Sequence, residues 1–85
     1  MTDLQKLTAL KNQLIFSGLD CKIQYINGTG KPEPSIYVNH DYCGMYPDNE
    51  VYHKISIIDS IVSRRSDLVV FRSHSKIGTR ITLMH

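Results

Sequence analysis

The chain has 85 residues, of which 41% are hydrophobic and 21% charged. This balance is typical of a small folded domain and excludes a disordered tail. The formal net charge of +2 is too small to indicate a partner by itself. A core of this size lies near the lower limit for independent stability, so dimerisation to a homodimer would supplement it.

The charge is unevenly distributed along the chain. Residues 1–52 contain four lysines and six acidic residues, whereas residues 53–85 contain six basic and two acidic residues. The second part could attract an anionic partner through this excess. The alternative is that the two parts form complementary faces within the fold or a dimer.

The N-terminal segment, MTDLQKLTALKNQ, is polar and amphipathic and has no apolar signal core. No apolar stretch approaches the roughly 18 residues that a membrane span needs. Cys21 and Cys43 are an even pair, which leaves a disulfide open. We expect a cytoplasmic protein with reduced thiols, because that is the ordinary state inside cells.

A first helix is predicted to begin after Thr2, because Thr2-Asp3-Leu4-Gln5 fits a capping box. Leucines then recur at spacings of three and four until Gly18, which is suited to the C′ position. Alternating residues predict a strand over 20–27, and a return strand over 35–39 follows. Pro32 and Pro34 are expected to prevent regular pairing between these strands, because neither has an amide donor.

The second part of the chain repeats this layout. A connector over 41–48 separates a unit at 1–40 from a unit at 49–85. Asp48 or Asn49 can cap a second helix, which apolar spacing and length predict to run to about Ser63. The isoleucines of this segment would also suit a strand. A hairpin follows over 66–85. Arg64 and Arg65 stand at the end of this helix, where positive charge offsets the macrodipole.

The predicted fold is therefore a single α+β domain of two tandem α-β-β units. They form a four-stranded antiparallel sheet with both helices packed on one face. Val69 and Phe71 are expected to point towards the helices, and Leu68, Val70 and Arg72 away from them. This register leaves an open face with the following residues: Lys22, Gln24, Ile26, Ser35, Tyr37, Asn39, Leu68, Val70, Arg72, Arg80, Thr82 and Met84. A slip of one residue would exchange the faces.

The open face and the connector are the candidate protein-binding surfaces. A solvated sheet face should not carry several large apolar side chains together, and tyrosine is enriched at binding surfaces. The candidate protein-binding residues are Tyr37, Tyr42, Met45, Tyr46, Tyr52, Leu68, Val70 and Met84. The alternative for the tyrosines near the connector is that their rings close over the end of a small core.

Nucleic acid is the alternative partner. A sheet platform binds single strands by stacking bases on aromatic rings and by contacting phosphates with cations. The candidate nucleic-acid-binding residues are Lys22, Arg64, Arg65, Arg72, Lys76 and Arg80. Tyr37 is the one aromatic residue expected on this face.

No motif in the chain indicates a chemistry. His40, Cys43 and His53, with Asp41 nearby, have suitable atoms for zinc, but their spacing matches no standard zinc pattern. A nucleophilic Cys43 would need an environment that favours the thiolate. There is no Walker loop, Rossmann fingerprint or CxxC. We therefore expect no metal, no cofactor and no catalytic residue.

His74 and His85 lie among cations, as the acid–base groups of a metal-free ribonuclease do. The segment FRSHSKIGTRITLMH resembles the basic second-strand region of small toxin ribonucleases with a double-stranded-RNA-binding-like fold. Those toxins carry their catalytic histidine just before this region, where this chain has Leu68, Val69 and Val70. The resemblance therefore does not transfer the activity, and a nuclease is the third reading.

The function predicted first is a small non-catalytic binding protein of the inhibitor or adaptor type. It would act by occupying the surface of a protein partner, as accessory proteins of phages and mobile elements do. A nucleic-acid-binding regulator is the alternative.

Overall fold

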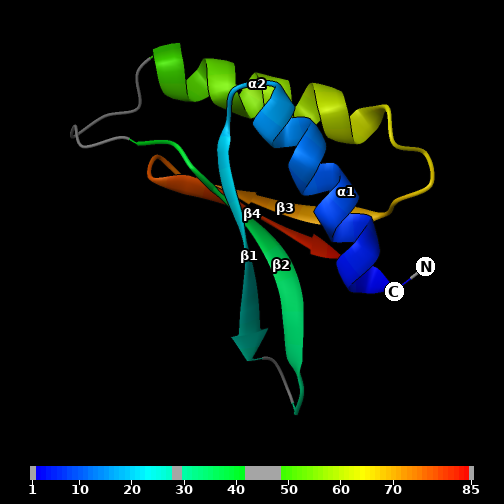
Figure 1. The fold of residues 1–85 in the computed structure, drawn as a ribbon. Coiled ribbons are helices and arrows are strands. Elements are labelled where there is room, and N and C mark those ends of the chain that lie inside the picture. Colours follow the sequence, from blue (N-terminus) through cyan, green and yellow to red (C-terminus); the bar gives the residue numbers. More distant parts are fainter. Residues whose placement is uncertain (1, 28–29, 42–48, 85) are drawn as a thin grey trace.

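The computed structural model describes residues 2–27, 30–41 and 49–84 (Figure 1). Its elements are α1 (Asp3–Phe16), β1 (Asp20–Asn27), β2 (Pro32–Asn39), α2 (Asn49–Ser63), β3 (Val70–His74) and β4 (Gly78–Leu83). The α-β-β-α-β-β order confirms the predicted tandem. Most of the predicted connector, residues 42–48, lies outside the described residues.

The start of α1 follows from its capping box. The backbone amide of Gln5 donates to Oγ1 of Thr2 at 3.2 Å, and the amide of Thr2 donates to Oε1 of Gln5 at 2.9 Å. Two amides that have no partner within the helix are thereby satisfied. At the other end Gly18 has φ +95°, a left-handed conformation that costs glycine little.

All four strands are antiparallel, in the order β1-β2-β4-β3. The two hairpins have the same register after a constant offset: they close at Asn27↔Pro32 and at His74↔Thr79, and 74 − 27 and 79 − 32 both equal 47. Adding 47 to the residue numbers that bound α1 gives the bounds of α2 to within one residue. The two α-β-β units are therefore geometric repeats.

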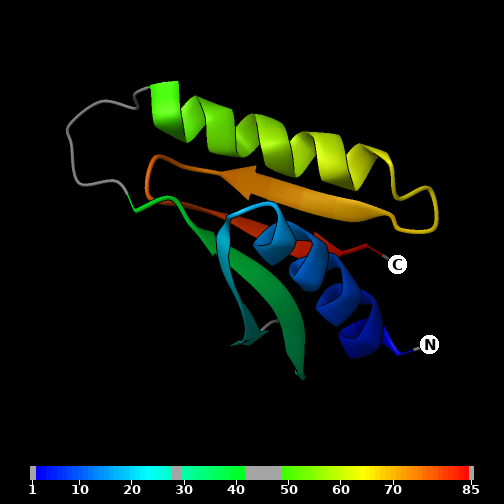
Figure 2. The same cartoon turned by 45° about the horizontal axis from the view of Figure 1, so that its top comes forward.

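The helices lie on the same side of the sheet in two views (Figures 1 and 2). Their apolar stripes meet the strand residues that point towards them in one core, as helix-on-sheet packing requires. The buried core cluster consists of Leu7, Leu10, Leu14, Leu19, Ile36, Val38, Ile58, Val62, Leu68 and Ile81. Both helices and the two central strands supply fully buried side chains. In the described part of the chain, no helix covers the opposite face of the sheet.

The structure corrects the expectation for the prolines. Pro32 and Pro34 belong to β2 and lie opposite Asn27 and Tyr25 of β1. On β2 the even-numbered amides face β4, because the amide of His40 donates to the carbonyl oxygen of Ile77. The β2–β4 pairing extends only to Ser35. The backbone nitrogens of Pro32 and Pro34 therefore face the side of β2 where no strand is paired. The hydrogen bonds between β1 and β2 lose no donor as a result.

Candidate functional site: the open face of the sheet

The strand register decides which side chains lie on the face without helices. Tyr37 and Arg80 are partners across β2 and β4, and Ile36 and Ile81, which alternate with them, are fully buried in the core. Because side chains alternate along a strand, the strand residues on the open face are Asp20, Lys22, Gln24 and Ile26 of β1, Glu33, Ser35, Tyr37 and Asn39 of β2, Gly78, Arg80 and Thr82 of β4, and Phe71 and Ser73 of β3. The expectation for β1, β2 and β4 is confirmed.

The expectation for the β3 segment is wrong by one residue. Val70 pairs with Leu83, and Arg72 pairs with Ile81, so both point towards the helices. Leu68 is buried in the core, and Val70 packs against it. Leu68 and Val70 therefore do not lie on the open face. Val69 and Phe71 lie there instead.

A sequence signal for this register was present. The offset between the units aligns Asp67 with Asp20, and Leu68 with Cys21, which packs against the core. Alternation within 66–72 alone allows either phase, because Leu68, Val69, Val70 and Phe71 are all apolar. The phase was decided by the pairing of β3 with β4.

An apolar patch occupies one end of the open face. The amide of Met84 donates to the carbonyl oxygen of Val69 at 2.9 Å, so these two residues are cross-strand neighbours. Val69, Phe71 and Met84 are 66%, 57% and 55% exposed. Val69 directly precedes β3 and Met84 directly follows β4. Three neighbouring apolar side chains with most of their area in water mark an interaction surface more often than a solvated face.

A polar cluster occupies the centre of the same face. Arg80 donates from Nη1 to Oγ of Ser35 at 3.1 Å and from Nη2 to Oε1 of Gln24 at 3.2 Å. Its guanidinium lies 5.6 Å from the ring centroid of Tyr37. The ring of Tyr37 in turn lies against Gly78, where no Cβ obstructs it. The side chains of this cluster hold one another in place, so the cation is presented in a defined position.

The remaining predicted protein-binding residues lie elsewhere or outside the described part. Tyr52 is exposed on α2, which lies on the other side of the sheet from Tyr37 and Met84. Tyr42, Met45 and Tyr46 lie outside the described residues. The open face therefore retains Tyr37 and Met84 of the predicted set.

The predicted nucleic-acid-binding residues do not converge on one face. Lys22 and Arg80 are on the open face. Arg72 forms an ion pair with Asp59 of α2 at 3.1 Å on the helix side. Arg65, which follows α2, binds Asp67 through two hydrogen bonds of 3.0 and 3.1 Å. That ion pair raises the pKa of Arg65 and lowers the pKa of Asp67. Lys76 lies in the turn between β3 and β4.

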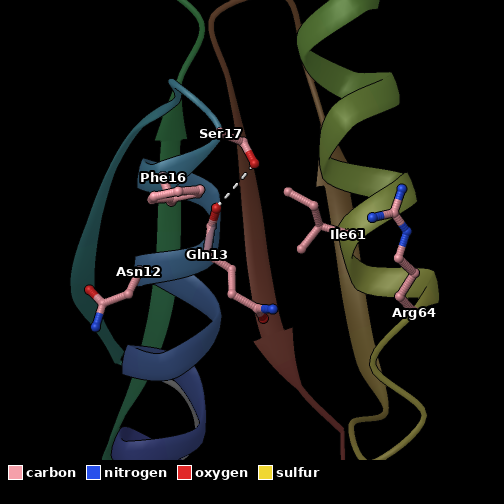
Figure 3. A pocket seen from close by; sticks show the side chains of 6 residues that line it. All are labelled: Asn12, Gln13, Phe16, Ser17, Ile61 and Arg64. Carbon is pink, nitrogen blue, oxygen red and sulfur yellow. Dashed lines mark hydrogen bonds between the residues drawn. The ribbon is translucent and has the colours of Figure 1, made fainter.

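Arg64 lines a groove of about 430 Å³ between the two helices (Figure 3). Ile61 points from α2 towards α1, and Gln13 points from α1 towards α2. Phe16 lines the α1 wall and is 92% exposed. The groove contains no acidic side chain, and it lies on the opposite side of the molecule from the open face.

The thiol and the histidines are placed as follows. Cys21 has a free thiol, and its partial burial, with the charge of Asp20 as a second cause, raises its pKa to about 11. His40 is buried against Thr79, and His53 is exposed on α2. Cys43 and His85 lie outside the described residues. Within residues 2–27, 30–41 and 49–84, no three His, Cys, Asp or Glu side chains are grouped as metal ligands.

Neither helix in the described part of the chain is long and apolar enough to cross a bilayer. Comparison with protein-family models, curated proteins and solved structures found no match for this chain.

Proposed function

We propose that the protein is a non-catalytic binding protein that holds a protein partner against the open face of its sheet, as an inhibitor or adaptor does. The observation that carries the proposal is the exposed apolar patch of Val69, Phe71 and Met84. Burying these side chains against a partner would contribute about 25 cal/mol per Å² of apolar surface. The adjacent Arg80 cluster supplies a positioned donor group beside that patch.

The charge of the open face also favours a protein partner. Lys22 and Arg80 are its cations, and Asp20 and Glu33 are on the same alternating set of strand positions. A nearly balanced face of this kind lacks the basic excess on which non-specific binding to phosphates depends. An exposed apolar patch with polar groups beside it is instead compatible with a protein interface.

The arrangement of His74 supports a non-catalytic role. Its Nδ1 lies 2.9 Å from Oγ1 of Thr79, and its Nε2 lies 3.2 Å from Oδ1 of Asp59. Both ring nitrogens are therefore engaged within the fold, whereas a general acid or base must reach the proton that it transfers. The free thiol of Cys21 fits a reducing compartment such as the cytoplasm.

The proposal can be tested by site-specific crosslinking in an extract of the native host. A photoreactive phenylalanine analogue replaces Phe71 in one variant and Tyr25 in the other. The two positions are 57% and 58% exposed, but Tyr25 is on the helix side of the sheet. We expect discrete protein adducts from position 71 and none from position 25. Equal adducts from both positions, or none from 71, would contradict the proposal.

A second variant separates binding from folding. Phe71→Ser should abolish capture of the crosslinked partner, because it removes the one aromatic ring of the patch. The free energy of unfolding should change by less than about 0.5 kcal/mol, since an exposed side chain contributes little to the core. A loss of stability above this value would mean that Phe71 is structural.

Single-stranded nucleic acid is the second candidate, and the placement of Phe71 favours it. The open face has two aromatic rings, Tyr37 on β2 and Phe71 on β3, and these strands lie on either side of β4, which carries Arg80. Successive bases could stack on them, at about 1–3 kcal/mol per base. Fluorescence anisotropy with a labelled oligonucleotide tests this. With Lys22 and Arg80 as the cations, the log–log salt slope should be about −1.4. No binding at micromolar protein in low salt would eliminate this candidate.

A further inference from the structure

A continuous chain of polar side chains runs between the helix side of the sheet and α2. Oδ1 of Asp59 lies 3.2 Å from Nε2 of His74, and Nδ1 of His74 lies 2.9 Å from Oγ1 of Thr79. Oγ1 of Thr79 also lies 2.9 Å from Nε2 of His40. His40 and Thr79 are buried, whereas the side chains of His74 and Asp59 are 27% and 47% exposed. The chain therefore connects the protein surface with a buried histidine.

The donors and acceptors allow one arrangement when both histidines are neutral. The carboxylate of Asp59 only accepts, so Nε2 of His74 carries the hydrogen and Nδ1 of His74 is an acceptor. Thr79 must then donate its single hydroxyl hydrogen to His74. Oγ1 of Thr79 can only accept from the other side, so Nε2 of His40 carries a hydrogen.

This arrangement has a consequence for the far side of His40. Its Nδ1 must be without a hydrogen, as an acceptor that needs a donor. Nδ1 is buried and has no hydrogen-bond partner among the described residues. The backbone of Ser75 and Lys76 lies close enough to favour the charged form of the ring, although no contact there has hydrogen-bond geometry. The backbone groups that favour a charged ring are hydrogen-bond acceptors. A protonated Nδ1 could donate to them, whereas an unprotonated Nδ1 cannot.

Protonation of His74 reverses the two hydrogen bonds to Thr79, while Nε2–H of His74 continues to donate to Asp59. With hydrogens on both nitrogens, His74 donates from Nδ1 to Oγ1 of Thr79. The hydroxyl hydrogen of Thr79 then turns towards Nε2 of His40, because Oγ1 of Thr79 contacts no other hydrogen-bonding group in the described part of the chain. Nε2 of His40 thereby becomes the acceptor. We propose that the chain is a proton relay, in which protonation of His74 converts His40 from its Nε2–H to its Nδ1–H tautomer.

The proton count of the relay balances. The protein takes up one proton from solvent, and the net result is one more hydrogen on Nδ1 of His74, one more on Nδ1 of His40 and one fewer on Nε2 of His40. The Nε2 proton of His40 passes to Oγ1 of Thr79, and the hydroxyl proton of Thr79 passes to Nδ1 of His74. His40 remains neutral and His74 carries the new charge. No heavy atom needs to move, because a nitrogen–oxygen separation of 2.9 Å suits a hydrogen bond to Thr79 in either direction.

The surrounding charges favour His74 over His40 as the charged ring. His74 faces the carboxylate of Asp59, whose charge Arg72 shares at 3.1 Å. His40 faces Lys54 of α2, whose Nζ donates to the carbonyl oxygen of His40 at 2.7 Å, and Lys76 stands in the neighbouring turn. Burial, the largest cause, and the charge of Lys54 both lower the pKa of His40. The relay does not depend on the open face or on what binds there.

The test is a pH titration of the full chain with ¹⁵N-labelled histidine, followed by long-range ¹H–¹⁵N correlation. A nitrogen without hydrogen resonates far downfield of one with hydrogen, so each tautomer is read directly. We expect His40 to be in the Nε2–H form at high pH. As His74 becomes charged, His40 should change to the Nδ1–H form with the same midpoint. Charging of His40 with His74, or an unchanged His40 tautomer, would overturn the relay.

Three variants confine the effect to Thr79. In Thr79→Val the hydroxyl is lost, so the tautomer of His40 should no longer follow the titration of His74. Thr79→Ser keeps a hydroxyl and should restore the coupling. Thr82→Val removes a hydroxyl from the same strand on the open face and should leave the coupling intact. If Thr79→Val does not fold, the comparison of Thr79→Ser with the unmodified chain still decides, because loss of coupling in a folded serine variant would contradict the proposal.

Discussion

The two α-β-β units have the same geometry and different chemistry. The offset of 47 residues superposes their helices and hairpin registers. It also aligns Asn12 with Asp59, and Asn27 with His74. In the second unit these positions form the ion pairs and hydrogen bonds that connect α2 to the sheet. In the first unit the aligned residues are neutral, and leucines of α1 dominate the contact.

The same comparison applies to the open face. Lys22 and Gln24 of the first unit align with Val69 and Phe71 of the second. One repeat therefore presents a polar outer surface, and the other presents the apolar patch. Because the backbone is equivalent, the difference lies in the side chains alone. A repeated scaffold supplies the sheet, and the second unit supplies most of what a partner would contact.

Truncating a core leucine should show that the first unit carries more of the stability. Leu10 is fully buried, whereas Ile57, at the aligned position, is partly buried. Leu10→Ala should reduce the free energy of unfolding by about 2–5 kcal/mol through lost burial and a residual cavity. Ile57→Ala should cost less than about 2 kcal/mol. Urea denaturation measures both, and equal losses would mean that the two helices contribute equally.

Gly78 and Lys31 form the next aligned pair. A Cβ at position 78 would lie 2.6 Å from Cζ of Tyr37 and 2.7 Å from the carbonyl oxygen of Val38. Gly78→Ala should therefore cost about 1–3 kcal/mol, as overpacking does. Lys31→Ala, at an exposed position, should change the free energy of unfolding by less than about 0.5 kcal/mol. A tolerated Gly78→Ala would show that Tyr37 and the backbone of β2 can both move aside.

His40 connects the units, because it follows β2 and bonds to β4. Its pKa is lowered from 6.5, chiefly by burial. The unfolded chain therefore binds this proton more readily than the folded one. Stability should be fully present above pH 6.5 and decline as the pH falls from there to the lowered pKa, by at most about 1.4 kcal/mol per pH unit. Urea denaturation across this range should show the decline in the unmodified chain and in His53→Gln, and should lose it in His40→Gln. An unchanged decline in His40→Gln would assign it to another group.

The smallest effect is expected for Asp59. Asp59→Ala removes the carboxylate that Arg72 and His74 share, but its side chain is 47% exposed and water screens the ion pairs. The free energy of unfolding should fall by about 0.2–1 kcal/mol at low salt, and by less at high salt. Asn12→Ala, the aligned change in the first unit, should show no salt dependence. The same salt dependence in both variants would indicate a general charge effect.

The local patterns determined the element order and the faces of three strands. The capping box at Thr2 acts between neighbouring residues, and spacing of three and four marks a helix wherever one side is buried. The strands β1, β2 and β4 alternate apolar with polar residues, so one phase alone buries their apolar side chains. These features involve a few adjacent residues, so they can be recognised from the sequence alone.

Only the tertiary structure decided the phase of β3, and with it the open face. Residues 68–71 are all apolar, so either phase buries similar area, and the hydrogen bonds to β4 select one. The pairing of Pro32 and Pro34 was likewise decided by where β4 ends. The chain from Asp59 to His40 joins residues far apart in the sequence, and no local pattern marks it. Local patterns specify elements, whereas the choice between equally apolar faces depends on which strand lies beside them.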